Sequence, residues 1–242
     1  MRIIFIAILL LPIFTLGACS TLPPDDPLSG YNHRMFNGNK AVDQAMFEPI
    51  AKGYHRATPE PVRGSVNNAL ANLRAPTDLL NNVLQGKIGA AVNTTVRFGI
   101  NSTIGIAGLF DPATDMGIAA KPEDFGQTLA VWGVQSGPYV VLPFFGPSNS
   151  RDSVGLVVDV VTHPFFLVQY QGATIAQVSR FSVNSLGLRT EAIDLIDNLD
   201  ENSLDEYAAY RSLYEQARDN AIRDGVIDID DLPDFDEFDD DY

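Results

Sequence analysis

The sequence has a single cysteine among 242 residues, which excludes an intrachain disulfide framework and a cysteine-rich zinc site. Basic residues are also scarce, since 16 lysines and arginines stand against 31 acidic residues and the net charge is -15. Such a surface repels phosphate backbones, which excludes a nucleic-acid binder acting through basic patches. No apolar run reaches the roughly 20 residues that a membrane-spanning helix needs. Hydrophobic residues nevertheless make up 45% of the chain, which excludes disorder of the whole protein.

Motifs for catalysis and cofactor binding are missing as well. The sequence has no G-x-S-x-G elbow, no phosphate-binding loop and no dinucleotide fingerprint. None of its three histidines has a second histidine or cysteine at metal-ligand spacing, so we expect neither a metal nor a cofactor. Asp124 and Asp152 have the chemistry of an acid/base pair, but nothing in the sequence brings them together. The sequence therefore favours a protein that is not an enzyme.

The N-terminus has the features of an export signal. Arg2 precedes an uncharged stretch from Ile3 to Gly17, which ends in Leu16-Gly17-Ala18-Cys19. This resembles the bacterial lipoprotein box, in which the cysteine becomes the first mature residue and carries acyl chains such as palmitate. The alternative is an ordinary signal peptide with a cysteine at the cut by chance. Ser20 follows the cysteine, and by resemblance to lipoprotein sorting in Gram-negative bacteria this favours the outer membrane.

The whole chain divides into four parts. Residues 1–18 are predicted to be the lipoprotein signal peptide, and residues 19–30 an acylated, proline-rich tether. Residues 31–223 are predicted to form one mainly helical domain. Residues 224–242 contain ten acidic residues and no basic one, which is typical of a disordered, solvated tail.

Helical periodicity dominates the predicted domain. Apolar residues recur at intervals of three to four over 35–56, and Pro49 is expected to bend or break that stretch. We expect Pro76 to start a new helix that runs over 77–85. Further helices are predicted over 151–161, 172–188, 191–199 and 203–223. Residues 139–142 are predicted to be a short strand or a buried connector.

The middle of the chain is almost uncharged. Only Lys87 and Arg97 carry charge between Leu79 and Phe110, and residues 125–150 carry none. One interpretation is a buried core. The other is a body that lies within a membrane, with its polar groups paired internally or lining a wet cavity.

One glycine-rich loop has features of a structural role, not of a catalytic site. Gly133, Gly137 and Pro138 lie in a short stretch between uncharged segments, which is compatible with a hinge or the rim of a pore. A plain connection between two elements is the alternative.

Many short motifs together resemble one family, the MlaA (VacJ) lipoproteins, over about residues 26–159. The motifs occur in the family's order and include DPLSGYN, MFN, NVLQG, NSTIG, FGQTL, WGV, GPY, LPF and GPS followed by Arg151-Asp152. The stretch after His163 carries little of the pattern.

The resemblance implies a single ring-like helical domain with little or no β structure, lying in the periplasmic leaflet of the outer membrane. It implies a lipid-anchored, non-enzymatic transporter that removes phospholipids from the outer leaflet through a polar-lined channel. The lipids would pass to a periplasmic carrier of the MlaC type, and a trimeric porin of the OmpC/OmpF type would be a partner. The side chains expected to meet headgroups or line the channel are Asn32, Asn37, Arg97, Asn101 and Gln127.

Two other functions compete with transport. The chain would be a structural lipoprotein if it only scaffolds a porin or an envelope assembly. It would be an acyl hydrolase if it degrades misplaced lipids, but the missing nucleophile motif weighs against this.

The predicted lipid anchor can be tested by replacing Cys19. We expect Cys19→Ala to give an unlipidated protein that no longer reaches the outer membrane, because a thioether at the sulfur attaches the acyl chains. Mass spectrometry and membrane fractionation measure both effects. A Cys19→Ala protein that stays in the outer membrane in normal amount would contradict the anchor.

Overall fold

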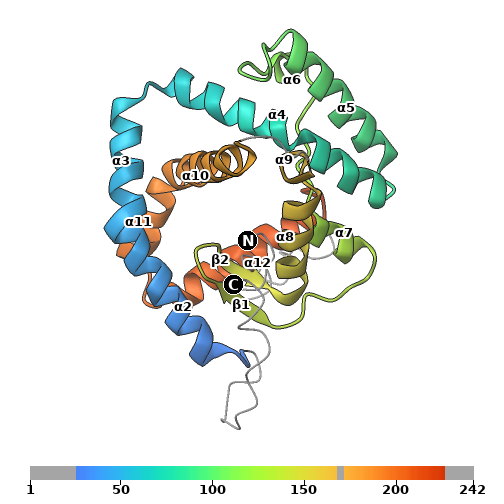
Figure 1. The fold of residues 1–242 in the computed structure, drawn as a ribbon. Coiled ribbons are helices and arrows are strands. Elements are labelled where there is room, and N and C mark those ends of the chain that lie inside the picture. The colour runs from blue at the N-terminus through green and yellow to red at the C-terminus, as the bar shows by residue number, and fades with distance from the viewer. Residues whose placement is uncertain (1–25, 168–171, 227–242) are drawn as a thin grey trace, which may run out of the picture.

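The computed structural model describes residues 26–167 and 172–226. Over these residues the chain is mainly helical, and its elements are arranged as a ring (Figure 1), as the resemblance implied. In the described ranges, no helix combines the length and the apolar character needed to cross a bilayer. Cys19, the predicted signal peptide and most of the tether and tail lie outside these ranges.

One side of the ring is a long helical arc. Helix α2 (Ser29–Val42) begins within the predicted tether, continues through a π-helical segment, η2 (Asp43–Phe47), and passes into α3 (Glu48–Ala57). Pro49 lies in the first turn of α3, where its missing N–H costs little. The chain therefore stays helical through Pro49, and the irregular turn falls just before it.

Helix α4 (Glu60–Leu84) forms the next part of the ring and corrects one prediction (Figure 1). The expectation that Pro76 starts a new helix is wrong, because α4 runs through this residue without a break. Pro76 cannot donate to the carbonyl of Asn72. Tertiary contacts with α5 (Ile88–Thr103) hold the helix, since α4 packs along α5 and the Asn72 side chain donates to Ser102 Oγ at 3.0 Å.

Two short helices are fixed at their first turns by aspartates. Asp111 caps α6 (Pro112–Asp115) by accepting from the Thr114 N–H. Asp124 caps α7 (Phe125–Val131), and Gln127 completes a capping box by accepting from the Asp124 N–H at 2.9 Å. Both helix starts are therefore set by local side-chain chemistry.

A two-stranded antiparallel hairpin joins α7 to the next long helix. Strand β1 (Tyr139–Leu142) pairs with β2 (Gly146–Asn149), with Tyr139 opposite Asn149. Of the two alternatives predicted for residues 139–142, a short strand or a buried connector, the structure shows the strand. Asn149 then caps α8 (Ser150–Thr162) by accepting from the Asp152 N–H at 2.8 Å.

The C-terminal third returns to the ring. It comprises α9 (Pro164–Leu167), α10 (Ala173–Glu191), α11 (Ile193–Asn202) and α12 (Glu206–Ile222). Helix α10 lies inside the turn formed by α3 and α4 in Figure 1 and contacts both. Helix α12 closes the arrangement with a small aromatic cluster in which Tyr207 packs against Phe36 of α2 and Tyr139 of β1.

Polar and apolar groups are distributed unlike those of a water-soluble domain. The buried residues in the described ranges include many asparagines, aspartates and threonines, such as Asn81, Asn82 and Thr128. Large apolar side chains are exposed along α4, α5 and the loop after α5, so the interpretation as a buried core is wrong for residues 79–110. The apolar side chains exposed on α5 and this loop are Ile88, Val92, Val96, Phe98, Ile104, Ile106, Leu109 and Phe110. In residues 125–150, Tyr139 and Val141 belong to the small buried cluster.

Two glycines let α7 and α8 cross closely. A Cβ on Gly155 would lie well inside van der Waals distance of the Gly126 backbone. A Cβ on Gly126 would overlap the Arg218 guanidinium. Side chains at these two positions would push apart α7, α8 and α12.

We therefore expect Gly155→Ala to lower the free energy of unfolding by about 1–3 kcal/mol through overpacking. Denaturant unfolding in detergent, followed by circular dichroism, measures the change. Gly99→Ala is the control, because a Cβ at Gly99 in α5 meets nothing within 4 Å and should be neutral or stabilising by up to about 1 kcal/mol. Equal effects from the two substitutions would contradict the close crossing.

Candidate functional site

A cavity of about 670 Å³ lies at the centre of the ring. Residues of η2, α4, α8, α10, α11 and α12 line it, together with the hairpin and Asp124. Because segments from along the whole fold contribute to one wall, the cavity is a property of the closed ring.

The lining combines two kinds of side chain. One is apolar and includes Phe144 and Phe145 at the hairpin turn, Leu156 on α8, and Phe181 and Leu188 on α10. The other is charged, with four arginines and four aspartates: Arg74, Arg180, Arg189, Arg218, Asp43, Asp124, Asp152 and Asp159. Such a wall suits an amphiphile with a charged head and an apolar body.

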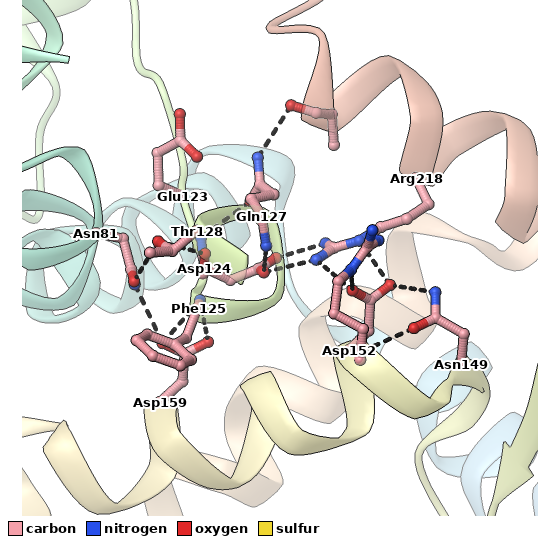
Figure 2. A network of polar contacts seen from close by, with 12 residues as sticks. Asn81, Glu123, Asp124, Phe125, Gln127, Thr128, Asn149, Asp152, Asp159 and Arg218 are labelled. Atoms are coloured by element: carbon pink, nitrogen blue, oxygen red, sulfur yellow. Dashed lines mark hydrogen bonds and ion pairs between the residues drawn. The ribbon is translucent and has the colours of Figure 1, made fainter. Parts of the chain in front are cut away.

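Arg218 ties together three of the helices around the cavity (Figure 2). Its guanidinium donates to both oxygens of Asp124 at 2.6 and 2.7 Å, and to Asp152 Oδ1 at 3.0 Å. Burial opposes ionisation of Asp124, but the Arg218 hydrogen bonds and charge outweigh it and lower the pKa of this carboxyl group. Asp152 also accepts from the Tyr214 hydroxyl at 2.6 Å. The structure thus brings Asp124 and Asp152 together on one guanidinium, which gives them a role in holding the ring.

A second set of polar contacts continues from α7 to α4 and α8 (Figure 2). Asp159 accepts from the Phe125 N–H at 3.0 Å and from the Asn81 side chain at 3.1 Å. Thr128 donates to Asn81 Oδ1 at 2.9 Å. Burial raises the pKa of Asp159, and the hydrogen bonds from Phe125 and Asn81 only partly offset that effect.

Buried carboxylates lie behind this wall. Glu123 is 1% exposed and accepts from Lys87 at 2.9 Å and from Gln85 at 2.8 Å. Burial raises the pKa of Asp78 to about 6, although Arg74 lies beside it with Nε 3.0 Å from Oδ1. Burial therefore outweighs the arginine charge here, because the Arg74 side chain is half exposed to solvent.

The cavity arginines differ in how they are paired. Arg189 binds both oxygens of Asp43 from Nε, at 2.9 and 3.0 Å. Arg74 donates to Asp78 and to the Glu123 carbonyl. Arg180 has no ion pair within the described residues, and its Nε has no hydrogen-bond partner. His163, which also lines the cavity, is neutral at physiological pH, because burial and then the charges of Arg180 and Arg74 lower its pKa to about 4.

An apolar recess of about 270 Å³ adjoins the cavity. The two share six residues, among them Phe47, Phe144, Phe145 and Ile196. Phe36, Val42 and Val141 are among the side chains that line the recess beyond them. A cavity with a charged and apolar wall and a more apolar recess therefore lie next to each other inside the ring.

The five predicted headgroup contacts do not line this cavity. Asn32 is buried, where it donates to Asp26 and to the Tyr139 carbonyl and accepts from the Val141 N–H. Asn37 is exposed on α2. Gln127 is buried in its capping box and donates to the Ala221 carbonyl at 3.0 Å.

The remaining two contacts lie outside the ring on the α5–α6 unit. Arg97 binds Asp111 at 2.7 Å and the Ile118 carbonyl, and Asn101 binds Asp111 at 2.8 Å. Burial opposes ionisation of Asp111, but hydrogen bonds from Thr114, Asn101 and Arg97 lower its pKa to about 2. These residues fix the unit that carries the exposed apolar side chains.

The loop predicted as a hinge or rim is exposed over residues 131–138. Gly133 and Gly137 have φ values of +85° and +67°, which favour glycine. Gly137 and Pro138 line a second, more polar cavity of about 580 Å³, on the side of the hairpin where Tyr139 and Arg211 lie. Tyr214 and Arg218 line both cavities and so separate them.

Sequence reasoning missed the arginines of α10. Arg180 and Arg189 lie in a stretch without a family motif, and a helical pattern alone does not reveal which face meets a cavity. The only available signal was two arginines in a helix that is otherwise uncharged up to Glu191.

Comparison with known proteins agrees with the geometry. A model of the family described as MlaA lipoprotein matches residues 24–221. The intermembrane phospholipid transport system lipoprotein MlaA of Escherichia coli K12 is 31% identical over 209 residues, with 84% of this chain and 80% of the relative covered. An uncharacterized protein of Rickettsia bellii is 33% identical over 204 residues, which are 82% of this chain and 77% of that protein.

A solved structure is similar throughout the fold. It comes from work on the structural basis for maintenance of bacterial outer membrane lipid asymmetry, and it superposes with a TM-score of 0.71 at 30% sequence identity. The match covers 81% of this chain and 98% of the other. From the family model, the relatives and this structure together, the chain belongs to the MlaA lipoprotein family.

Proposed function

We propose that this protein transports phospholipids to maintain outer-membrane lipid asymmetry, and that headgroups pass through the cavity at the centre of the ring. The observation that carries the proposal is the cavity of about 670 Å³, whose wall is both charged and apolar. Three of the relatives support the substrate class, since each is named as an intermembrane phospholipid transport system lipoprotein.

The energetics of a lipid headgroup explain why a passage is needed. Moving an ion into hydrocarbon costs several kcal/mol or more, so headgroups do not cross a leaflet freely. A wall with arginines and aspartates replaces part of the water that a headgroup loses. The acyl chains stay in contact with apolar side chains or with lipid. No bond needs to be broken, and the protein acts without catalysis.

The outer surface supports a position within a leaflet. Each large apolar side chain that leaves water contributes about 1.5–3 kcal/mol, and many such side chains are exposed on α4, α5 and the loop that follows. Acyl chains around this surface would supply that stabilisation. With the lipid anchor at Cys19, the ring would lie in the periplasmic leaflet of the outer membrane.

Two protein partners complete the proposal. A trimeric porin would hold the ring in the membrane, and a soluble carrier in the periplasm would receive the lipid. Energy for directional transport would come from beyond this chain, because the sequence has no nucleotide-binding motif.

The glycine loop is proposed as a hinge at the rim. Its positive φ values at Gly133 and Gly137 and its exposure allow it to change conformation without disturbing a core. Pro138 leads directly into β1, so movement of the loop would reach the hairpin that lines the cavity.

Filling the cavity should stop transport. Ser185 lines the cavity from α10, and we expect Ser185→Trp to block clearance of phospholipid from the outer leaflet because the indole occupies the passage. The readout is labelling of phosphatidylethanolamine on intact cells by an amine-reactive reagent that does not cross membranes. Labelling should rise to the level of cells that lack the protein.

Ser179→Trp is the matched control, since Ser179 is exposed on the opposite face of α10 and does not line the cavity. It should leave labelling unchanged. Normal clearance by a folded, porin-bound Ser185→Trp protein would contradict the passage and favour a scaffolding function.

Stiffening the loop should slow transport. We expect Gly133→Ala to reduce the rate of clearance, because a side chain at positive φ costs about 1–2 kcal/mol and restricts the loop. Gly117→Ala, the control, carries the same strain at φ +80° with equally open surroundings, but lies after α6. The hinge is wrong if both variants clear lipid at the same rate in the cell-labelling assay.

A further inference from the structure

Arg180 lies in the wall of the central cavity and has no ion-pair partner among residues 26–167 and 172–226. Its Nε is buried and makes no hydrogen bond, and none of the ion pairs within the described residues includes it. The other cavity arginines hold carboxylates: Arg74 binds Asp78, Arg189 binds Asp43, and Arg218 binds Asp124 and Asp152. Arg180 is therefore not needed to join elements of the ring.

The surroundings of Arg180 add positive charge rather than remove it. Burial, and then the charge of Arg74, lower the pKa of Arg180 below its usual range. His163 lies close enough for both arginines to depress its own pKa. A buried cation next to another cation is costly unless an anion joins it. In a chain with net charge -15, an acidic partner from the protein would have been easy to place.

The recess next to the cavity narrows the choice of anion. Phe144 and Phe145 line both spaces, so an anion at Arg180 would have apolar surface within the same enclosure. A small inorganic anion makes no use of that surface. An amphiphile with a phosphate group and an acyl chain uses both.

We propose that Arg180, together with Arg74, binds the phosphodiester of a glycerophospholipid inside the cavity, with the acyl region against Phe144 and Phe145. This inference rests on the proposed function and adds to it a phosphodiester-binding site at Arg180 and Arg74, called the station below. Guanidinium groups suit the role because they donate two parallel hydrogen bonds to phosphate oxygens. The station recognises the phosphodiester, which phospholipids with different headgroups share.

The test is a binding measurement on the purified, lipidated full-length protein in detergent. The probe is phosphatidylglycerol with a fluorescent acyl chain, and diacylglycerol with the same chains is the comparison that lacks the phosphate. We expect Arg180→Gln to weaken phosphatidylglycerol binding about tenfold or more, since a charge-assisted hydrogen bond is lost, and to leave diacylglycerol binding unchanged. Arg180→Lys should bind with intermediate affinity.

Stability provides a second readout. Because Arg180 makes no ion pair in the part of the chain that the structure describes, Arg180→Gln should keep or raise the melting temperature while it weakens lipid binding. Arg34→Gln removes the same charge from an exposed position on α2 away from the cavity, and it should change neither quantity. Unchanged phosphatidylglycerol affinity in Arg180→Gln would overturn the proposal. Binding of sodium phosphate that depends on Arg180, without binding of the lipid, would also overturn it.

The lipid-binding station at Arg180 and the passage of headgroups through the cavity are tested by different variants, so either proposal can be wrong while the other holds. If Ser185→Trp blocks clearance but Arg180→Gln binds phosphatidylglycerol normally, the passage stands and the station is wrong. If lipid binding depends on Arg180 but Ser185→Trp clears lipid normally, the station stands and the passage is wrong.

Discussion

A ring with a cavity at its centre cannot be held together by one shared hydrophobic core, so its joints must be made elsewhere. Here the main joint is the guanidinium of Arg218, which binds Asp124 at the start of α7 and Asp152 at the start of α8. Gly126 and Gly155 bring the two helices close enough for one side chain to serve both. Breaking a fully buried ion pair typically costs about 3–5 kcal/mol, and breaking this partly buried one, with Arg218 and Asp124 side chains 15% and 25% exposed, costs less. A few polar contacts nevertheless join the helices of the ring. The apolar side chains are thereby left for the outer surface and the cavity wall.

Much of the fold could be predicted from local chemistry. Asn149 caps α8 and residues 139–142 form a strand, because both depend on residues next to them in sequence. Pro76 lies inside a helix instead of starting one, because a single missing N–H is tolerated when the helix packs along its length against another. The partner strand β2 was not predicted either, since its sequence, GPSN, has little strand propensity and pairs only because the hairpin turn returns it to β1.

The candidate site was harder to predict than the fold. Polar residues such as Asn32 and Gln127 stand out in the family motifs, and the structure uses both within the protein's own hydrogen-bond network. A motif identifies that a residue matters but does not separate a residue that builds the ring from one that meets a ligand. The two arginines of α10 could be recognised only in the closed fold, because burial and the presence or absence of ion-pair partners are properties of the tertiary structure.

The π-helical segment between α2 and α3 has a consequence for the geometry of the whole arc. A π turn contains one residue more than an α turn, which corresponds to about 100° of rotation around the helix axis. This offset lets Asp43 and Phe47 point to the cavity while Phe36, on the preceding helix, packs between Tyr207 and Tyr210. The number of residues in η2 therefore sets how far the side chains of α3 are rotated about the helix axis relative to those of α2. Loss of one residue here would turn an entire helix away from its neighbours, even if every remaining side chain were unchanged.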